Sequence, residues 1–307
     1  MLEQIIFFSS GAEQSNAMNL YAAGEADVVS NHSVPFTWVD KLSSMKDYIS
    51  APEAQITYLT INNTKPPMDD RRVRAAFNLS IDKMALAEWR KVARPLTTLT
   101  PADIFVGYPR PQDVAFDPER ARQLLAEAGF RDAAGNYDPQ KFPVDQVELT
   151  YNPSGSNRAI VEFVQAQLKQ NLGLTIPLKS IEFRTLLSIR YRLEYKGFSL
   201  SFYTLEYMDP FTLLSIFAED NGTGWSDPKY IQMLNEANFM VDHEKRYELL
   251  AKAEAYLLGE QPIIPLMTGR SNWLKKPYVK GLYSNPRALP IWKFVYIDAH
   301  PENWGID

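Results

Sequence analysis

The stretch INNTKPPMDDRRVRAAFNLSID, residues 61–82, predicts a sharp strand-to-helix connection in this chain of 307 residues. Pro66 and Pro67 have fixed φ angles and no backbone N–H group, so a helix cannot run back across them. Asp69 or Asp70 can cap the next helix by accepting backbone N–H groups that lack intrahelical partners. Apolar residues then recur at helical spacing, which predicts one buried helix face: Val73, Ala76, Phe77 and Ile81.

The basic residues of this stretch do not indicate a nucleic-acid surface. Arg71, Arg72 and Arg74 form a short basic run beside Asp69 and Asp70. The chain as a whole has a net charge of −5 and contains no long basic tract of the kind that nucleic-acid binding needs. We therefore expect the three arginines to form a solvated helix face.

Composition bounds the class of protein. A chain of 307 residues that is 45% hydrophobic can bury a sizeable core and form two domains. The absence of cysteine excludes disulfides, thiolate zinc sites and cysteine nucleophiles. No apolar run is long enough to span a bilayer. Residues 2–8 are a short strand-like run that contains Glu3, so no secretory signal is visible.

Helical and strand-like segments alternate throughout, which predicts an α/β fold. The expected strands are 5–8 (buried), 27–30, 55–61, 147–151, 174–178, 198–203, 263–267, 272–275 and 291–297. The expected helices are 13–22, 36–42, a segment bracketed by Asp117 and Gly129, 156–172, 184–195, 211–217, and two helices capped by Asp227 and Asp242, the second ended by Gly259. Residues 147–178 have the length of a parallel strand–helix–strand crossover.

The residue patterns of common catalytic sites are missing. His32, His243 and His300 lie far apart and have no metal-ligand spacing. The chain has no strained G-x-S-x-G turn, no phosphate-binding loop and no dinucleotide-binding glycine motif. We therefore expect neither an enzyme nor a metal or cofactor site.

Six segments resemble, in family order, the signatures of the family-5 extracellular solute-binding proteins, which are the oligopeptide- and dipeptide-binding components of ABC importers. They are residues 61–82, AGEADV at 23–28, DPERARQLLAEAGF at 117–130, LEYMDPFTLLSIF at 205–217, NGTGWSDPKY at 221–230 and QPIIPLMTGRSNWLKKPYVKGLY at 261–283. Together they extend across nearly all of the chain, from residue 23 to residue 283.

The resemblance implies a periplasmic-binding-protein-like class II two-lobe fold, with the N-terminal part of the first lobe missing. Residues 1–58 would form a partial lobe I, residues 59–270 lobe II, and residues 271–307 the return to lobe I. On this interpretation the chain is the C-terminal portion of a longer binding protein, as an expressed fragment or a truncated gene.

The resemblance also implies ligand-binding residues. Residues 205–217 are similar to the family's D-Y-x-D-P element, whose first acid pairs with the α-ammonium group of a bound peptide in peptide binders. Glu206 occupies that position and Tyr207 follows it. The segment EFRT at 182–185 resembles E-W-x-T, so Phe183 replaces a tryptophan that lines the ligand cavity. Arg190 matches a basic position that some oligopeptide binders turn toward the ligand.

Three further residues fall where the family's cleft would be: Tyr203, Tyr58 and Asn157. A structural role is the alternative for each of them. For Glu206 the alternative is a solvated loop acid, for Phe183 an ordinary core residue, and for Arg190 a surface helix charge.

The function implied by the resemblance is non-covalent capture of oligopeptides between two lobes and delivery to ABC permease subunits in the membrane. The full-length protein would be periplasmic, or extracytoplasmic and membrane-associated, and monomeric when intact. The alternatives are another solute (nickel chelate, oligosaccharide or opine) or a truncated fragment that acts only as an interaction module. Without one cleft wall, we expect weak oligopeptide binding and apolar surface near residues 5–8 and 291–297 that is open to self-association.

Overall fold

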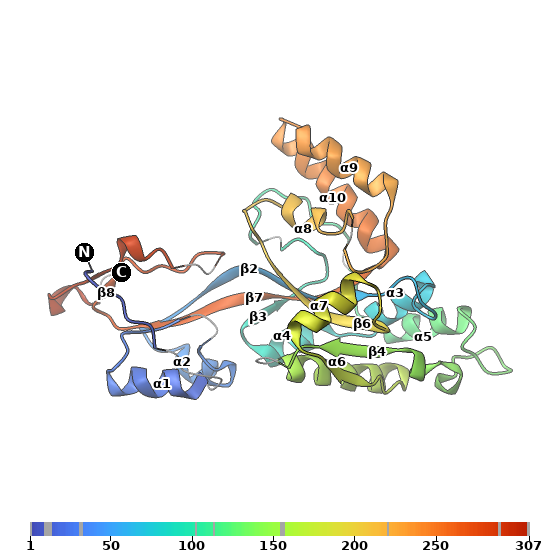
Figure 1. Cartoon of the computed structure of the whole chain (residues 1–307), viewed down its shortest axis with the longest axis horizontal. Coiled ribbons are helices and arrows are strands. Elements are labelled where there is room, and N and C mark those ends of the chain that lie inside the picture. Colours follow the sequence, from blue (N-terminus) through green and yellow to red (C-terminus); the bar gives the residue numbers. More distant parts are fainter. Residues whose placement is uncertain are drawn as a thin grey trace. The chain divides into compact units, whose positions relative to one another are not determined.

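The computed structural model describes residues 2–8, 14–30, 33–101, 103–112, 114–153, 157–219, 221–287 and 290–305. The chain forms two compact units (Figure 1). Unit 1 comprises Met1–Gln55, Ala87–Arg94 and Thr268–Asp307, and unit 2 comprises Ile56–Leu86 and Pro95–Met267. Strands β2 (Tyr48–Ile61) and β7 (Ile263–Lys275) run from one unit into the other. The units differ from the predicted lobe boundaries at residues 56–58, 87–94 and 268–270, and the assignment of lobes stays a prediction.

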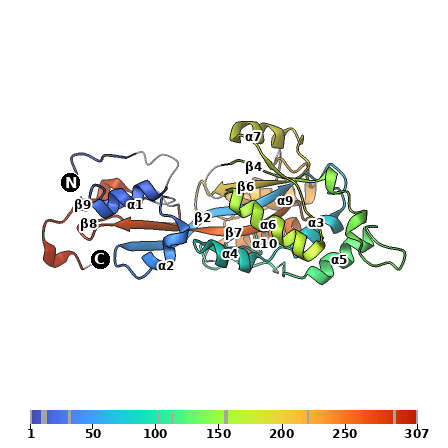
Figure 2. The same ribbon diagram turned by 90° about the horizontal axis from the view of Figure 1, so that it is seen from below.

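Unit 2 is built on a sheet with the strand order β7-β2-β6-β4-β5, in which β6 spans Gly197–Thr204, β4 spans Glu148–Tyr151 and β5 spans Leu178–Ser180. Strand β4 pairs in parallel with both β5 and β6, and helix α6 (Asn157–Leu172) connects β4 to β5 (Figure 2). The predicted parallel crossover is confirmed, although β5 begins at Leu178 rather than at residue 174. Residues 198–201 of β6 are all buried, as is typical of a strand covered on both faces.

The helices of unit 2 begin largely where aspartates predict them. They are α3 (Arg71–Leu79), α5 (Pro118–Glu127), α6, α7 (Phe183–Tyr191), α8 (Phe211–Ser215), α9 (Pro228–Phe239) and α10 (His243–Glu260), with 3-10 turns at Pro139–Lys141 and Val144–Gln146; α4 (Lys83–Arg90) starts in unit 2 and ends in unit 1. The side chains of Asp70, Asp117, Asp227 and Asp242 each accept a backbone N–H group at a helix start. Helices α9 and α10 lie side by side (Figure 1).

The apolar face of α3 lies in the core of unit 2, as its spacing predicts. Val73, Ala76 and Phe77 are buried. The ring of Phe77 lies 4.9 Å from that of Phe198 on β6 and 5.6 Å from that of Phe142, measured between centroids. Burial of each such large side chain stabilises the fold by about 1.5–3 kcal/mol.

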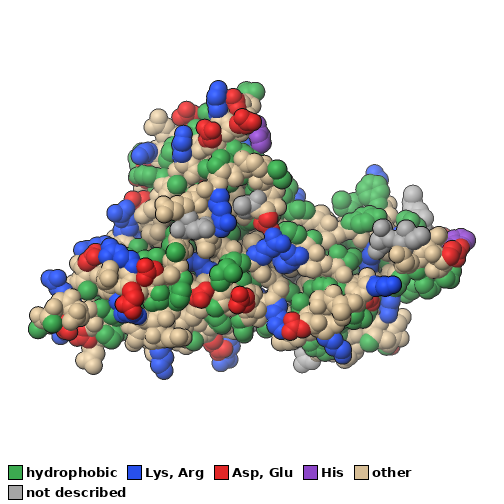
Figure 3. All heavy atoms as spheres, turned by 180° about the vertical axis from the view of Figure 1, so that it is seen from behind, with side chains coloured by type: hydrophobic (Ala, Val, Ile, Leu, Met, Phe, Trp, Pro, Cys, Tyr) green, Lys and Arg blue, Asp and Glu red, His purple; other side chains and the backbone are tan. Residues whose placement is uncertain are grey.

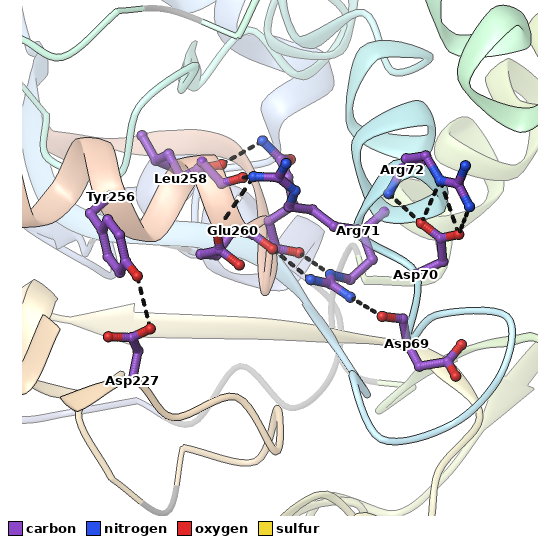
Figure 4. A network of polar contacts seen from close by, with 11 residues as sticks. Asp69, Asp70, Arg71, Arg72, Asp227, Tyr256, Leu258 and Glu260 are labelled. Carbon is purple, nitrogen blue, oxygen red and sulfur yellow. Dashed lines mark hydrogen bonds and ion pairs between the residues drawn. The ribbon is translucent and has the colours of Figure 1, made fainter. Parts of the chain in front are cut away.

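The expectation of a solvated arginine face is wrong for one of the three residues. Arg74 is buried, and its guanidinium donates to four backbone carbonyls at 2.7–3.0 Å, those of Met68, Asp69, Glu260 and Gln261. Arg71 and Arg72 are exposed as predicted, and Arg72 makes a forked contact with the capping carboxylate of Asp70 (Figure 4). The helical pattern did not reveal Arg74 because its acceptors come partly from a segment almost 190 residues later in the chain.

Unit 1 contains short elements around the continuing parts of β2 and β7. They are α1 (Gln14–Ala23), β1 (Val28–Val29), a 3-10 turn at Phe36–Trp38, α2 (Val39–Leu42), β8 (Val279–Lys280), a 3-10 turn at Trp292–Phe294, β9 (Tyr296–Ile297) and a 3-10 turn at Pro301–Asn303. Strand β1 pairs antiparallel with β7, and β8 with β9; β3 (Ala93–Pro95) also pairs with β7. The predicted strands 263–267 and 272–275 are parts of the one strand β7.

Several predicted elements differ from the structure. The expected strand 291–297 is a strand only at Tyr296–Ile297, and the expected helix 184–195 ends at Tyr191. Residues 5–8 form no strand, and Ile6 and Phe7 are 65% and 73% exposed, because no described strand pairs with them; the ring of Phe7 instead contacts Trp292 at 5.7 Å. Gly259 does not end α10, which continues to Glu260, where Gln261 takes the left-handed cap position with φ 56°. The side chain of Gln261 accepts from Asn78 at 2.6 Å, and this buried contact holds Gln261 in place.

Stability should depend on the buried amine of Lys83. Its Nζ donates to the backbone and side-chain oxygens of Asn78 at 3.0 and 2.7 Å, and burial lowers the pKa of Lys83 to about 7. The unfolded chain keeps this proton up to about pH 10, so between these values the unfolded state binds more protons and the free energy of unfolding rises with pH. We expect Lys83→Met to flatten that rise in urea unfolding between about pH 7 and about pH 10.

The matched control for this experiment is Lys169→Met, which changes an exposed lysine of α6. It should keep the pH dependence of the unmodified protein. Equal slopes for the Lys83→Met variant and the unmodified protein would contradict the role given to this amine.

Candidate functional site

All seven residues proposed from the sequence belong to unit 2. Tyr58 lies on β2, Asn157 begins α6, Phe183 and Arg190 lie on α7, Tyr203 lies on β6, and Glu206 and Tyr207 lie in the connection from β6 to α8. Their positions on neighbouring elements can be compared within this one unit. Their ligand-binding roles stay predictions.

Tyr58 is the buried centre of one group. Burial raises the pKa of its hydroxyl to about 12, and Arg190, Tyr191 and Tyr203 are close enough to act on it electrostatically. Its ring packs edge-on against Phe217 with 5.7 Å between centroids. Tyr58 therefore lies in the core beneath Arg190, Tyr191 and Tyr203, which are more exposed.

Arg190 is the half-buried cation of this group. Its Nη1 donates to Ser201 Oγ on β6 at 2.6 Å, and that hydroxyl is 2.7 Å from Thr60 Oγ1 on β2. Gly222 leaves room for its stem, because a Cβ atom there would lie 2.8 Å from Arg190 Cγ. No carboxylate of the described residues forms an ion pair with Arg190. A positioned guanidinium that pairs with none of the described carboxylates favours an anionic ligand group.

The connection that carries Glu206 and Tyr207 is exposed but anchored. Asp209 pairs with Arg246 of α10 through two bonds of 2.7 and 2.9 Å and also accepts the backbone N–H of Phe211 at 2.8 Å. The hydrogen bond to Asp209 raises the pKa of Arg246. Glu206 is exposed and makes no hydrogen bond to any other residue that the structure describes. Its carboxylate thus remains available to a cationic group.

Phe183 is not a core residue, since 53% of it is exposed. It begins α7, where Glu182 caps the helix by accepting the N–H groups of Arg184 and Thr185, both at 3.0 Å. An exposed aromatic ring held at a capped helix start can pack on a ligand without reorganising.

Asn157 and Tyr203 have identifiable structural contacts. Asn157 is buried, and its Nδ2 donates to the side-chain and backbone oxygens of Asn152 at 2.7 and 3.2 Å, across the turn from β4 to α6. Tyr203 is half-buried, and its hydroxyl is 3.1 Å from Thr212 Oγ1. These contacts account for the alternative, structural role of both residues.

Sequence reasoning missed several residues of this region. Tyr191, Phe202 and Met208 are exposed apolar residues on α7, β6 and the following connection. Ser201 and Arg246 hold Arg190 and Asp209 in place. Alternation along β6 could have indicated that its last residues emerge from the core, but no local signal marks the partners of Ser201 and Arg246. We call the four aromatic residues Phe183, Tyr191, Tyr203 and Tyr207 the aromatic wall.

The described part of the chain contains no cluster of three or more histidine, aspartate or glutamate side chains able to hold a metal ion. Its helices also include none that is both long and apolar enough to cross a membrane.

A family model described as bacterial extracellular solute-binding proteins, family 5 Middle, matches residues 2–225. The dipeptide-binding protein DppE of Bacillus subtilis (strain 168) is 27% identical over 290 residues, which cover 90% of this chain and 51% of DppE. The periplasmic murein peptide-binding protein MppA of Escherichia coli (strain K12) is 28% identical, with 98% of this chain and 56% of MppA covered. The chain spans about half the length of the curated relatives it matches.

Two solved structures similar to this chain are also those of peptide-binding proteins. An oligopeptide-binding protein from Borrelia burgdorferi (OppAIV) superposes with a TM-score of 0.79 at 29% identity, covering 94% of this chain and 57% of that protein. The unliganded open form of MppA gives a TM-score of 0.76 at 26% identity, with 94% and 56% covered. These neighbours have the two-lobe fold predicted from the sequence.

Proposed function

Because this chain belongs to the family-5 bacterial extracellular solute-binding proteins, we propose that it binds a peptide or similar solute non-covalently for an ABC importer. The observation that carries the proposal is the half-buried Arg190, held by Ser201 and free of carboxylate partners in the described chain, beside the aromatic wall. In this proposal the protein works outside the cytoplasm and hands its solute to membrane permease subunits.

The chemistry of the wall suits a peptide. Aromatic rings pack on peptide backbone and on apolar side chains without demanding one sequence. Arg190 offers a fixed donor group to a carboxylate, and the exposed Glu206 offers an acceptor to an ammonium. A zwitterionic solute with apolar groups complements these features, and no bond has to be made or broken.

A second candidate solute is an amphipathic anion without an ammonium group. It is favoured by the exposed ring of Tyr191, whose centroid lies 5.8 Å from the guanidinium carbon of Arg190. Among the relatives, one from Escherichia coli (strain K12) is named a probable deoxycholate-binding protein and one from Haemophilus influenzae a heme-binding protein. Such a solute would use Arg190 and the wall but not Glu206.

Titration calorimetry with short peptides and end-blocked analogues tests the proposal. Arg190→Gln should weaken binding of peptides with a free carboxylate about tenfold, because one charge-assisted hydrogen bond is lost. C-terminally amidated peptides should bind both proteins equally. Glu206→Gln should have the same selective effect on peptides with a free amine relative to N-acetylated ones.

The matched control is Arg184→Gln, which changes an exposed arginine of the same helix. It should bind all peptides like the unmodified protein. If Arg190→Gln also binds them unchanged, Arg190 is not the ligand's counter-ion; if only acetylated, carboxylate-bearing or bile-acid-like solutes bind, the second candidate replaces the first.

We also propose that the apolar surface of unit 1 is covered by a second copy of this chain. Residues 5–8 and 291–297 expose most of their large apolar side chains, and the contact of Phe7 with Trp292 brings the two segments together. Contiguous apolar surface of this kind is typical of interfaces. Sedimentation velocity should show concentration-dependent association that Phe7→Ser with Phe294→Ser reduces; a monomer at every concentration would refute this.

A further inference from the structure

A second exposed apolar feature lies away from the aromatic wall, where α9 meets α10. Phe239 ends α9, Asp242 caps α10, and Met240 and Val241 lie between them. Phe239 is 83% exposed and Val241 is 98% exposed. We call Phe239, Met240 and Val241 the α9–α10 tip.

The tip is held in place by the helices on both sides. Met240 donates its N–H to Ala237 O at 3.3 Å, and Asp242 accepts the N–H of Lys245 at 3.2 Å. Arg246 Nε also donates to Ala237 O at 3.0 Å, while its guanidinium pairs with Asp209. The apolar side chains are thus presented to solvent by an ordered turn, and binding them to a partner orders little additional chain.

Acidic side chains surround the tip. Glu236 lies one turn before the end of α9, and Asp242, Glu244 and Glu248 lie at the cap and in the first two turns of α10. All four are exposed, and the neighbouring Lys245 is paired with Asp242 at 3.2 Å. Figure 3 shows acidic side chains beside hydrophobic ones at this end of the hairpin.

We propose that the α9–α10 tip is a docking knob for a partner protein that offers an apolar pocket rimmed by lysine or arginine. An apolar centre with a charged rim is the arrangement of many specific protein interfaces, and opposite charges around it guide association. The inference rests on the proposed function, under which the partner is the extracytoplasmic surface of the membrane permease.

The negative charge around the tip favours a basic protein surface over a second copy of this chain or a membrane as the binding partner. A second copy docking tip to tip would bring the acidic residues around the two tips together, and the repulsion between like charges disfavours this. Anionic lipid headgroups would meet the same repulsion, and interfacial membrane anchors carry lysine and arginine beside their apolar residues rather than acids. A basic protein surface meets no such penalty.

The test measures binding of this protein to the ABC permease of the same organism, reconstituted in nanodiscs of neutral lipid. Phe239→Ser with Val241→Ser should weaken binding about tenfold or more, as loss of a central apolar anchor does. Glu244→Lys with Glu248→Lys should weaken it too and should reduce its dependence on salt. Met84→Ser changes an exposed apolar residue of α4 and should leave binding unchanged.

Peptide titrations on the same proteins separate this inference from the proposed function. The tip variants should bind peptide like the unmodified protein, so loss of permease binding alone supports the knob. The docking proposal is wrong if both tip variants still bind the permease, or if a protein shown to bind peptide never binds the permease. Either result leaves the proposed solute binding unaffected. Capture by anionic vesicles, or a dimer that the Phe239→Ser/Val241→Ser substitution abolishes, would overturn the docking proposal in favour of a membrane or a second copy.

Discussion

The buried guanidinium of Arg74 is the interaction on which the arrangement of unit 2 depends. It bonds the carbonyls of Met68 and Asp69 before α3 and those of Glu260 and Gln261 after α10. A buried charge is tolerated only when its donors are satisfied, so these four carbonyls must stay together. The two chain segments joined in this way lead from β2 and into β7, the strands that continue into unit 1.

The same junction sets the position of the candidate site. Strand β2 carries Tyr58 and Thr60, and Thr60 meets Ser201 of β6, which in turn holds Arg190 of α7. Arg246 of α10 fixes the connection after β6 through Asp209. A rigid scaffold therefore presents one fixed cation, an exposed acid and a set of aromatic rings on one unit, which is what non-covalent recognition of a solute requires.

Much of the fold could be predicted from the local chemistry of the sequence. Contacts between residues far apart in the sequence could not. Aspartate caps, prolines and apolar spacing predicted the starts of α3, α5, α9 and α10, and segment lengths predicted the parallel crossover. The burial of Arg74 depends on carbonyls at residues 260 and 261, and the Thr60–Ser201 contact joins residues 141 positions apart. Resemblance to a family indicated Phe183 and Arg190. It did not indicate Ser201 and Arg246, which act through side-chain contacts, or Tyr191, which is recognised by its exposure.

Hydrogen–deuterium exchange of this chain, with and without a saturating short peptide, tests whether α7, β6 and the connection after β6 bind the solute. We expect slower exchange in α7 and in residues 205–209, because a bound ligand stabilises the segments that it contacts. Protection confined to other parts of unit 2, such as α5, with α7 unchanged, would contradict it.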